Sequence, residues 1–387
     1  SQQLNDTYLG VVGITVIFYL LGLTNEESRS LIERTFKKNQ EKNLICFQNT
    51  RVICENEKLP LKKIERYHYT GNRINTGNNL VALGALMAGL DYYCSYPMTP
   101  ASSILHFLAG QSEKFGIIVQ HTESEIAAAN MVVGAAFSGA RSVSGTSGGG
   151  FALMTEAFSL ACMTETPVLF IVSARPGPAT GMSTYTAQTD LNFVLNAGHG
   201  EFPRIVASPG NFEQAFHLSA RLLDLAWYFQ TPTVLLTEKH LSESSANHAV
   251  NPDQYQDLPV LETQEIPYKR YQITQNGISP LKFPPSGEMI KWNSNEHYEN
   301  GIRTDDPEMA TAMAEKRFRK QQTINEYIQA HDEMIKCYGD EGPVVVCYGS
   351  VLMSLLEAAK HIPFNIRIVQ VIYLDPFPEK ELMTYVN

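Results

Sequence analysis

The sequence predicts an α/β protein built on a parallel sheet, and three observations indicate this fold class. Apolar runs rich in β-branched or aromatic residues alternate with helical stretches from about residue 70 to residue 238. Clusters of glycine and proline follow several of these runs, as they do where a strand leads into a loop. The composition, with 44% hydrophobic and 18% charged residues in 387, is that of an ordinary globular protein. In such folds helices cover both faces of the sheet, and ligands bind beyond the carboxyl ends of the strands.

The charge and the cysteines argue against several classes of function. A formal net charge of −10, without a dense run of Lys or Arg, argues against a nucleic-acid partner. No two cysteines form a CxxC pair, so we expect no metal or iron–sulfur cluster on this chain. Reduced thiols in the cytoplasm are the simpler expectation for a chain of this size. The six cysteines are Cys46, Cys54, Cys94, Cys162, Cys337 and Cys347.

Residues 1–65 are expected to be the end of a larger domain. Tyr8–Leu23 is predicted to be a helix, and its apolar stretch of about 15 residues is shorter than the roughly 20 that span a membrane. We therefore expect no membrane association. Thr24 can cap a second helix from Glu26 to about Lys38. Two short helices cannot bury much core by themselves.

Residues 70–245 carry the regular alternation and are expected to form one complete parallel-sheet domain. The predicted strands are Tyr92–Tyr96, Gly116–Gln120, Pro167–Val172, Arg204–Ala207 and Thr231–Leu236. The predicted helices are Asn78–Gly89, Ala101–Phe115, Glu123–Ser138, Phe151–Met163 and Asn211–Phe229.

The composition and the predicted structure change twice in the last third of the chain. Residues 246–338 are expected to be an extended connector, rich in Pro, Asn, Gln and Gly, followed by a polar helix from Pro307 to about Tyr338. Residues 339–387 then begin a second α/β unit. Pro343–Ser350 is predicted to be a strand leading into a turn and a helix that ends near Lys360, and Ile366–Tyr373 is the next strand.

The first loop that could carry chemistry is Tyr96-Pro97-Met98-Thr99-Pro100, which follows the first strand. Its two prolines hold the backbone around the single hydroxyl of Thr99. The alternative is a rigid turn in which Thr99 caps the next helix and Pro100 occupies the first helical position.

Two other loops after strands carry charged candidates. Glu123 and Glu125 begin a helix rich in alanine, where a carboxylic acid could exchange a proton with a ligand. The alternative is that both acids compensate the helix dipole. Arg175 lies among prolines and glycines at a strand end and can bind a carboxylate through two parallel hydrogen bonds. A surface arginine is the alternative, although it would not need so much fixed backbone.

Two further segments give weaker signals. The run Gly145–Gly150 resembles a phosphate-binding loop but lacks the GxxxxGK[ST] and GxGxxG spacings. A later stretch holds Gln188, Asp190, His199 and Glu201, and a structural role for this histidine is favoured over a catalytic one because no partner spacing accompanies it.

Taken in order, these segments resemble the α subunits of the 2-oxoacid:ferredoxin oxidoreductases of the 2-oxoglutarate/2-oxoacid type. Each segment is a weak motif alone, but the ordered series is specific and runs from about residue 70 to the end. The resemblance implies a pyrimidine-type thiamine-diphosphate-binding domain at 70–245, the end of a gamma-type domain at 1–65, and the start of a transketolase C-terminal-like α/β domain at 339–387. The matching segments are YPMTPAS (96–102), ESEIAAANMVVGAAFSGAR (123–141), TSGGGFALMTEA (146–157), RPGPATGMST (175–184), QTDL (188–191), GHGE (198–201) and WNSNEHYENGIRTDDPEMATAMAEKR (292–317).

The resemblance implies CoA-dependent oxidative decarboxylation of a 2-oxo acid, with electrons passing to ferredoxin, or the reverse carboxylation. Thiamine diphosphate with Mg²⁺ would be shared with a β subunit, because this sequence lacks a GDG motif for the diphosphate and cysteines for a cluster. The β subunit is expected to hold a [4Fe–4S] cluster in a heteromer such as (αβ)2. The alternatives are a thiamine enzyme with another acceptor and a non-catalytic interaction subunit. The motif order argues against the first, and retention of Thr99, Glu125 and Arg175 argues against the second.

By match to the family's motifs, Glu125 is the expected catalytic acid. Its carboxyl group would hydrogen-bond the pyrimidine ring of the cofactor and promote the reactive ylide, and Glu123 is the fallback. Tyr96 and Pro97 are expected to contact the same cofactor.

The resemblance also implies a substrate site on this chain. Arg175 would pair with the carboxylate of the 2-oxo acid, and Thr99 would donate a hydrogen bond to that carboxylate or to the keto oxygen. Thr180 is expected to support this site from behind.

Overall fold

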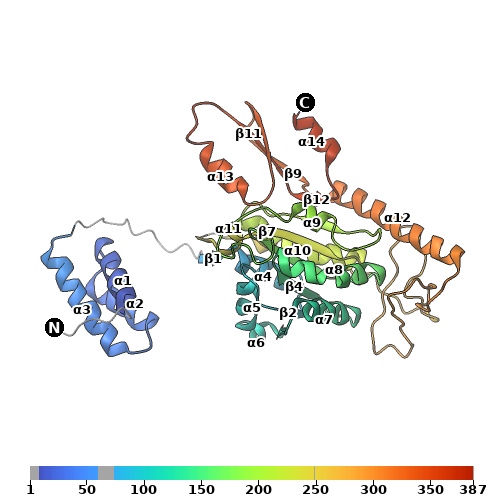
Figure 1. Cartoon of the computed structure of the whole chain (residues 1–387), viewed down its shortest axis with the longest axis horizontal. Helices are drawn as coiled ribbons and strands as arrows, with labels where there is room; N and C mark the ends of the chain where they lie inside the picture. The colour runs from blue at the N-terminus through green and yellow to red at the C-terminus, as the bar shows by residue number, and fades with distance from the viewer. Residues whose placement is uncertain (1–7, 60–73, 248, 387) are drawn as a thin grey trace. The chain divides into compact units, whose positions relative to one another are not determined.

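The computed structural model describes residues 8–59, 74–247 and 249–386 (Figure 1). The chain divides into two compact units, Ser1–Gly71 and Asn72–Asn387. The boundary that the sequence places near residues 65–70 lies outside the described residues.

The described part of the first unit contains a third helix besides the expected pair. The helices are α1 (Leu9–Leu20), α2 (Asn25–Thr35) and α3 (Gln40–Asn56). Thr24 caps α2 as predicted, and Glu27 completes a reciprocal capping box with it. Helix α3 was not predicted from the sequence; its N-cap residue, Asn39, has left-handed backbone and makes no side-chain capping bond. The small core of this unit consists of Val11, Ile32, Cys46 and Phe47.

The apolar helix α1 is only 12 residues long. At 1.5 Å per residue it is about 18 Å long, well short of the roughly 30 Å of a bilayer's hydrocarbon core. Across the ranges that the structure describes, no helix combines the length and the hydrophobicity that a membrane span requires.

The second unit is built on a seven-stranded sheet in the order β12-β6-β7-β5-β4-β2-β3. Neighbouring strands are parallel except at one edge, where β12 runs antiparallel to β6. The predicted α/β fold with a mainly parallel sheet is confirmed. The strands are β2 (Tyr92–Ser95), β3 (Ile118–His121), β4 (Ser142–Thr146), β5 (Leu169–Ala174), β6 (Ile205–Ala207), β7 (Thr233–Glu238) and β12 (Tyr373–Asp375).

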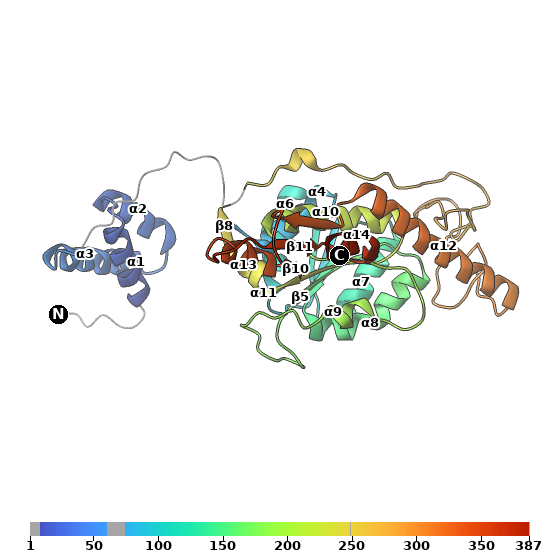
Figure 2. The ribbon, with the colours of Figure 1, turned by 90° about the horizontal axis from the view of Figure 1, so that it is seen from above.

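Helices cover both faces of this sheet, with α4 and α10 on one side and α7 and α8 on the other (Figure 2). The helix expected at 101–115 is divided at Gly110 into α5 and α6. A two-stranded ribbon of β1 (Ile74–Thr76) and β8 (Ser245–Asn247) adjoins α4 and α11. The helices are α4 (Gly77–Met87), α5 (Ser102–Ala109), α6 (Ser112–Phe115), α7 (Glu125–Phe137), α8 (Gly148–Met163), α9 (Leu191–Leu195), α10 (Phe212–Phe229) and α11 (Lys239–Glu243).

Strand β4 was not predicted from the sequence, although it lies in the interior of the sheet. Its sequence, SVSGT, contains one large apolar residue and therefore shows no apolar run. All five residues are nevertheless buried. Small residues are required here because a Cβ on Gly145 would lie 2.6 Å from the Tyr93 hydroxyl.

The connector is largely irregular, as expected, with a 3₁₀ turn at Pro252–Gln254 before the long helix α12 (Pro307–His331). The prediction of a helix up to Tyr338 was wrong at its end. Asp332 has extended backbone and accepts two hydrogen bonds from Arg221, at 2.9 and 3.0 Å. This anchor ends the helix, and the next residues form strand β9 (Ile335–Tyr338).

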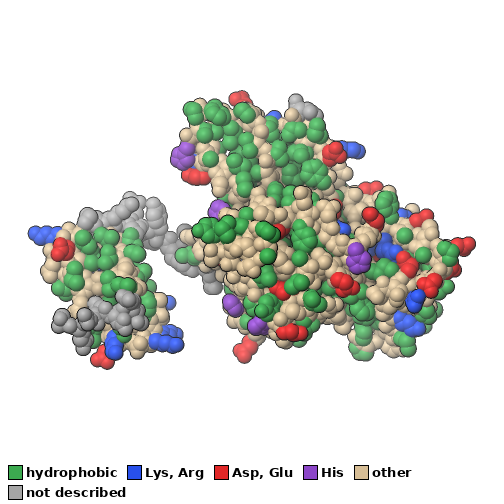
Figure 3. All heavy atoms as spheres, in the orientation of Figure 1, with side chains coloured by type: hydrophobic (Ala, Val, Ile, Leu, Met, Phe, Trp, Pro, Cys, Tyr) green, Lys and Arg blue, Asp and Glu red, His purple; other side chains and the backbone are tan. Residues whose placement is uncertain are grey.

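A second sheet of three strands, in the order β10-β11-β9, follows the connector. The predicted strand Ile366–Tyr373 is divided, because β11 stays in this sheet whereas β12 joins the large sheet. Hydrophobic side chains gather on the surface over this part of the chain, where Val351, Phe364 and Met383 are exposed (Figure 3). Its remaining elements are β10 (Val344–Cys347), β11 (Arg367–Val371), α13 (Val351–Ala358) and α14 (Glu379–Val386).

Asp375, at the end of β12, gives a testable pH dependence. Burial raises the pKa of its carboxyl group to about 6, although Arg204 partly opposes this shift. Because the folded state binds this proton more tightly than the unfolded state, the charged group destabilises the fold above pH 6, and the cost disappears as the pH falls toward 4. Asp375→Asn should therefore raise the free energy of unfolding at pH 8 by about 1–3 kcal/mol.

Urea unfolding of both proteins at pH 8 and at pH 5 measures this difference. The advantage of the asparagine variant should shrink at pH 5, and the exposed Asp340→Asn provides the control. A difference that stays constant or grows on acidification would contradict the assignment.

Candidate active site

Glu125 is the first residue of α7, directly after the loop that follows β3. The loop is fixed because Thr122 Oγ1 donates to the carbonyl oxygen of Ser124 at 2.9 Å, and the Ser124 hydroxyl caps the helix by accepting from the Ala127 N–H at 3.2 Å. The Glu125 side chain is 3% exposed, whereas Glu123 is exposed to solvent.

The start of α8 closes over this carboxyl group. A Cβ on Gly150 would lie 2.9 Å from Glu125 Oε1 and only 2.0 Å from Thr146 Oγ1, so only glycine fits here. Glu125 Oε1 is buried and has no hydrogen-bond partner among the described residues. A buried carboxyl oxygen without a partner costs free energy, which is typical of a group that meets a ligand.

The loop after β2 lies against the same helix start. The Met98 sulfur is 2.6 Å from the Ser147 hydroxyl, at the residue that precedes α8. The N-cap residue of α5 is Ala101, so the alternative in which Thr99 caps that helix is wrong. The carbonyl oxygen of Thr99 instead accepts a hydrogen bond from Arg175 Nη1 at 2.7 Å.

Arg175 follows β5 and joins the third predicted loop to the first. Its side chain is half-buried, and its own carbonyl oxygen accepts from the Thr189 hydroxyl at 3.0 Å. One of its five N–H donors reaches Thr99, and the rest of the guanidinium remains able to grip an anion. The loop turns sharply at Gly181, where φ is +54° and a Cβ would lie 1.7 Å from the Pro176 carbonyl oxygen.

Known proteins resemble this chain over the region that holds these loops. The family described as "Pyruvate flavodoxin/ferredoxin oxidoreductase, thiamine diP-bdg" matches residues 83–316, which include all three loops. The chain belongs to this family. It is 34% identical to the 2-oxoacid:ferredoxin oxidoreductase 1, subunit alpha, of Sulfurisphaera tokodaii, over 95% of this chain and 61% of that protein. The resemblance to these α subunits is thus confirmed, and the chain spans about three-fifths of the length of this relative.

Two further similar proteins extend the comparison. The 2-oxoglutarate synthase subunit KorA of Archaeoglobus fulgidus is 31% identical over 80% of this chain and 83% of its own length. The solved 2-oxoglutarate:ferredoxin oxidoreductase of Magnetococcus marinus, with 2-oxoglutarate, coenzyme A and succinyl-CoA bound, has a TM-score of 0.82 at 27% identity. The matched region covers 97% of this chain and 68% of the solved chain.

The structure separates the site residues that the sequence suggested into two groups. Thr99 and Arg175 lie on loops, and Glu125 lies at the start of α7; these segments contact one another or the start of α8. Tyr96 and Thr180 are exposed, and Pro97 is half-buried between Tyr96 and Met98. The Tyr96 ring lies 6.3 Å from that of His121, its neighbour across the sheet edge. The roles of all these side chains remain predictions.

Two glycines at the start of α8 shape this candidate site in a way that the sequence did not predict. Gly148 and Gly150 permit the close approach of two carboxyl groups, those of Asp190 and Glu125. The glycines themselves were visible in the run Gly145–Gly150. That run was compared with phosphate-binding loops, however, and not with a helix start against which carboxyl groups pack.

The far end of the Arg175 loop is also fixed. Gln188 Nε2 donates to the Tyr348 carbonyl oxygen at 2.9 Å, in the turn after β10. In the same turn the Ser350 N–H donates to the carboxylate of Glu238 at 3.1 Å. Burial raises the pKa of Glu238, and its bonds to Ser350 oppose that shift. The turn between β10 and α13 therefore lies beside the carboxyl edge of the main sheet.

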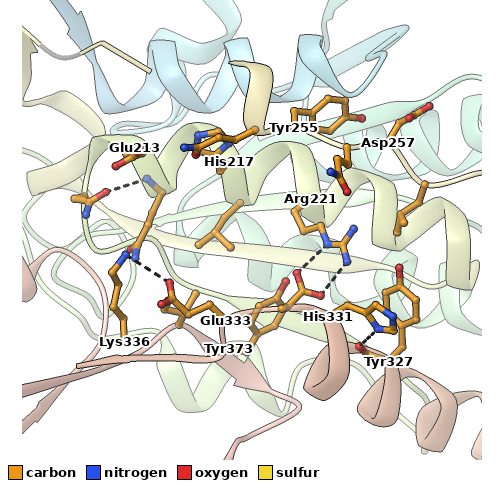
Figure 4. A pocket seen from close by; sticks show the side chains of 18 residues that line it. Glu213, His217, Arg221, Tyr255, Asp257, Tyr327, His331, Glu333, Lys336 and Tyr373 are labelled. Atoms are coloured by element: carbon orange, nitrogen blue, oxygen red, sulfur yellow. Dashed lines mark hydrogen bonds and ion pairs between the residues drawn. The ribbon is translucent and has the colours of Figure 1, made fainter. Parts of the chain in front are cut away.

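A separate pocket of about 620 Å³ lies along α10 and shares no lining residue with these loops (Figure 4). Some of its charged groups are paired with one another. Arg221 is paired with Asp332, and the His331 ring stacks on that of Tyr327 at 4.2 Å. None of the residues that the sequence suggested for catalysis lines this pocket, and we assign no role to it.

Proposed function

We propose that this chain is the α-type chain of a heteromeric, cytoplasmic 2-oxoacid:ferredoxin oxidoreductase and supplies the pyrimidine side of a thiamine diphosphate site. The reaction converts the anion of a 2-oxo acid, CoA and two oxidised ferredoxins into acyl-CoA, CO2, one proton and two reduced ferredoxins, or runs in reverse. The single observation that carries the proposal is the buried, unpartnered Oε1 of Glu125 in a chain of this family.

The residues around Glu125 fit such a cofactor. Its carboxyl group is held by the capped start of α7 and faces the glycine-lined start of α8. In this proposal Glu125 holds a proton at Oε1 and shares it with the aminopyrimidine ring. Sharing this proton requires a carboxylic acid in a site that excludes water. When bound, thiamine diphosphate supplies the carbon nucleophile and the electron sink for decarboxylation.

The same edge of the sheet can bind the substrate. Arg175 would pair with the carboxylate of the 2-oxo acid, because its planar guanidinium presents parallel donors. Its bond to the Thr99 carbonyl oxygen keeps the arginine beside the Thr99 hydroxyl, which would donate to the substrate. Thr180 would act only through the shape of the same loop.

A partner chain completes the site in this proposal. The rim of the loops exposes Tyr96, Met182 and Tyr185, with 39, 54 and 62% of their surfaces accessible. Exposed apolar side chains beside a site are typical of an interaction surface. We expect a β subunit to cover this rim and to bring the Mg²⁺–diphosphate site and a [4Fe–4S] cluster, in an assembly such as (αβ)2.

The test is reduction of ferredoxin or methyl viologen by the co-purified complex, with and without a 2-oxo acid and CoA. Pyruvate, 2-oxoglutarate and a branched-chain 2-oxo acid should be compared. Two relatives named for 2-oxoglutarate make it the first substrate to try. Viologen reduction that no 2-oxo acid stimulates would overturn the proposal.

Arg175→Ala should raise the KM for the 2-oxo acid by about 10- to 100-fold, the effect of losing a charged hydrogen-bonded pair. The KM for CoA should stay the same, because CoA does not meet this guanidinium in the proposal. Arg175→Lys should recover only part of the loss, since an ammonium group lacks the parallel donors. Steady-state viologen reduction measures all three values, and an unchanged KM for the 2-oxo acid in the alanine variant would show that Arg175 points elsewhere.

A further inference from the structure

The start of α8 lacks the side-chain cap that a helix of 16 residues normally has. Ser147 occupies the N-cap position, yet its hydroxyl makes no capping bond, because it lies against the Met98 sulfur. The first N–H groups of the helix therefore need another acceptor or a nearby negative charge.

The carboxylate of Asp190 lies at this uncapped start. A Cβ on Gly148 would be 2.4 Å from Asp190 Oδ2 and 2.5 Å from Oδ1, so the glycine makes room for the carboxylate. Asp190 Oδ2 is buried and has no hydrogen-bond partner among the described residues. Burial raises the pKa of Asp190, and the Thr189 hydroxyl and the charge of Arg175 oppose that shift.

Asp190 belongs to the same loop as Arg175. The neighbouring Thr189 hydroxyl holds the Arg175 carbonyl oxygen at 3.0 Å. The Ala179 carbonyl oxygen, in the middle of the loop, would lie 3.6 Å from a Cβ on Gly149, which places the loop over the first turn of α8. The loop thus leaves β5 at the arginine, crosses the helix start and returns to it at the aspartate.

We propose that Asp190 is a positioning residue for Arg175: its carboxylate, set into the space left by Gly148, pins the 175–190 loop to the positive end of α8. The inference rests on the proposed function, because the arginine's ligand is the carboxylate of the 2-oxo acid. It adds a residue that touches neither cofactor nor substrate and acts through the loop.

Three variants of the intact complex test the inference: Asp190→Ala, Gly148→Ala and the double variant. Asp190→Ala should raise the KM for the 2-oxo acid about tenfold, as expected for loss of one electrostatic anchor, and should keep kcat within about twofold. Gly148→Ala should have a similar effect, because its new Cβ expels the carboxylate. The double variant should be no worse than Asp190→Ala alone, since the methyl group then enters the space that the carboxylate leaves.

The control is Gly134→Ala on α7, whose added Cβ meets nothing within 4 Å. It should leave the KM for the 2-oxo acid unchanged. An unchanged KM in Asp190→Ala, or a double variant whose effect is the product of the two single effects, would overturn the inference.

Hydrogen exchange supplies a readout that needs no turnover. Backbone N–H groups of the non-proline residues in 176–189 should exchange faster in Asp190→Ala and in Gly148→Ala than in the wild-type complex, and they should be unaffected in Gly134→Ala. If the wild-type complex shows no viologen reduction that depends on a 2-oxo acid, the proposed function is refuted. Hydrogen exchange then decides the inference alone: faster exchange in the variants supports the anchor, and unchanged exchange overturns it. Faster exchange with an unchanged KM in an active complex would overturn the link to Arg175.

Discussion

Replacing Glu125 by glutamine should lower the 2-oxo-acid-dependent turnover of the assembled complex by about 10²- to 10⁴-fold, the usual contribution of a positioned acid or base. Glutamine has nearly the same size as glutamate, so it should fit in the space that Gly150 leaves beside this side chain. It carries no acidic proton, however, so the proton that Oε1 is proposed to share with the cofactor is lost. The fold should survive because Oε1 makes no hydrogen bond to the described residues.

Turnover, melting temperature and co-purification with the partner should be measured together on this variant. The matched control is Glu123→Gln, because Glu123 lies two residues earlier and is exposed. Its turnover should remain near the wild-type value. If the control loses activity while Glu125→Gln keeps it, Glu123 is the acid. If neither loses activity, the carboxyl chemistry assigned to this loop is wrong.

The loops at the carboxyl edge could be predicted because chain order alone locates them. Each candidate directly follows a run that forms a strand, and parallel strands bring their carboxyl ends to one edge. Thr99 and Arg175 are 76 residues apart in the sequence and joined by a hydrogen bond of 2.7 Å in the structure. The sequence could say that they share an edge, but the bond itself depends on the loop conformations.

The features that the sequence did not reveal depend on contacts between distant segments. Strand β4 has no apolar run because the Tyr93 side chain fills the space beside Gly145. The long helix stops at His331 because Asp332 pairs with Arg221 on another helix. In each case a tertiary contact outweighs the local pattern. The sequence around each residue does not indicate which distant residue it will contact.

A buried ionic cluster, which includes none of the proposed catalytic residues, holds the connector and α12 to the main sheet domain. Lys316 and Lys320, one turn apart on α12, both bind the carboxylate of Glu165, with Lys316 Nζ at 2.6 Å from Oε1. Arg270 from the connector donates to the Glu165 carbonyl oxygen at 2.6 Å and to the Gln230 side chain at 3.0 Å. Glu165, Lys316 and Lys320 are at most 1% exposed.

The charges of this cluster depend on one another. Burial by itself would raise the pKa of Glu165, but Lys316, Lys320 and Arg270 outweigh it and hold that pKa far below its ordinary value. Burial lowers the pKa of Lys316 to about 7, and the attraction of Glu165 opposes that shift. One carboxylate thus keeps several buried cations in place, and in the described hydrogen bonds of Lys316, Lys320 and Arg270 no other acceptor carries a negative charge.

Glu165→Ala should therefore destabilise the protein by about 3–5 kcal/mol at pH 7, because it leaves buried cations without their partner. The wild type's advantage should hold down to about pH 4, where an unfolded glutamate takes up its proton, and should decline below it, since the folded carboxylate has the lower pKa. Glu165→Ala combined with Lys316→Met and Lys320→Met should recover much of the loss, because apolar side chains tolerate this burial. Glu357→Ala, which removes an exposed ion pair with Lys360, should change the unfolding midpoint little. Urea unfolding measures all four proteins, and a Glu165→Ala midpoint equal to the wild-type value would mean that the cluster contributes no net stability.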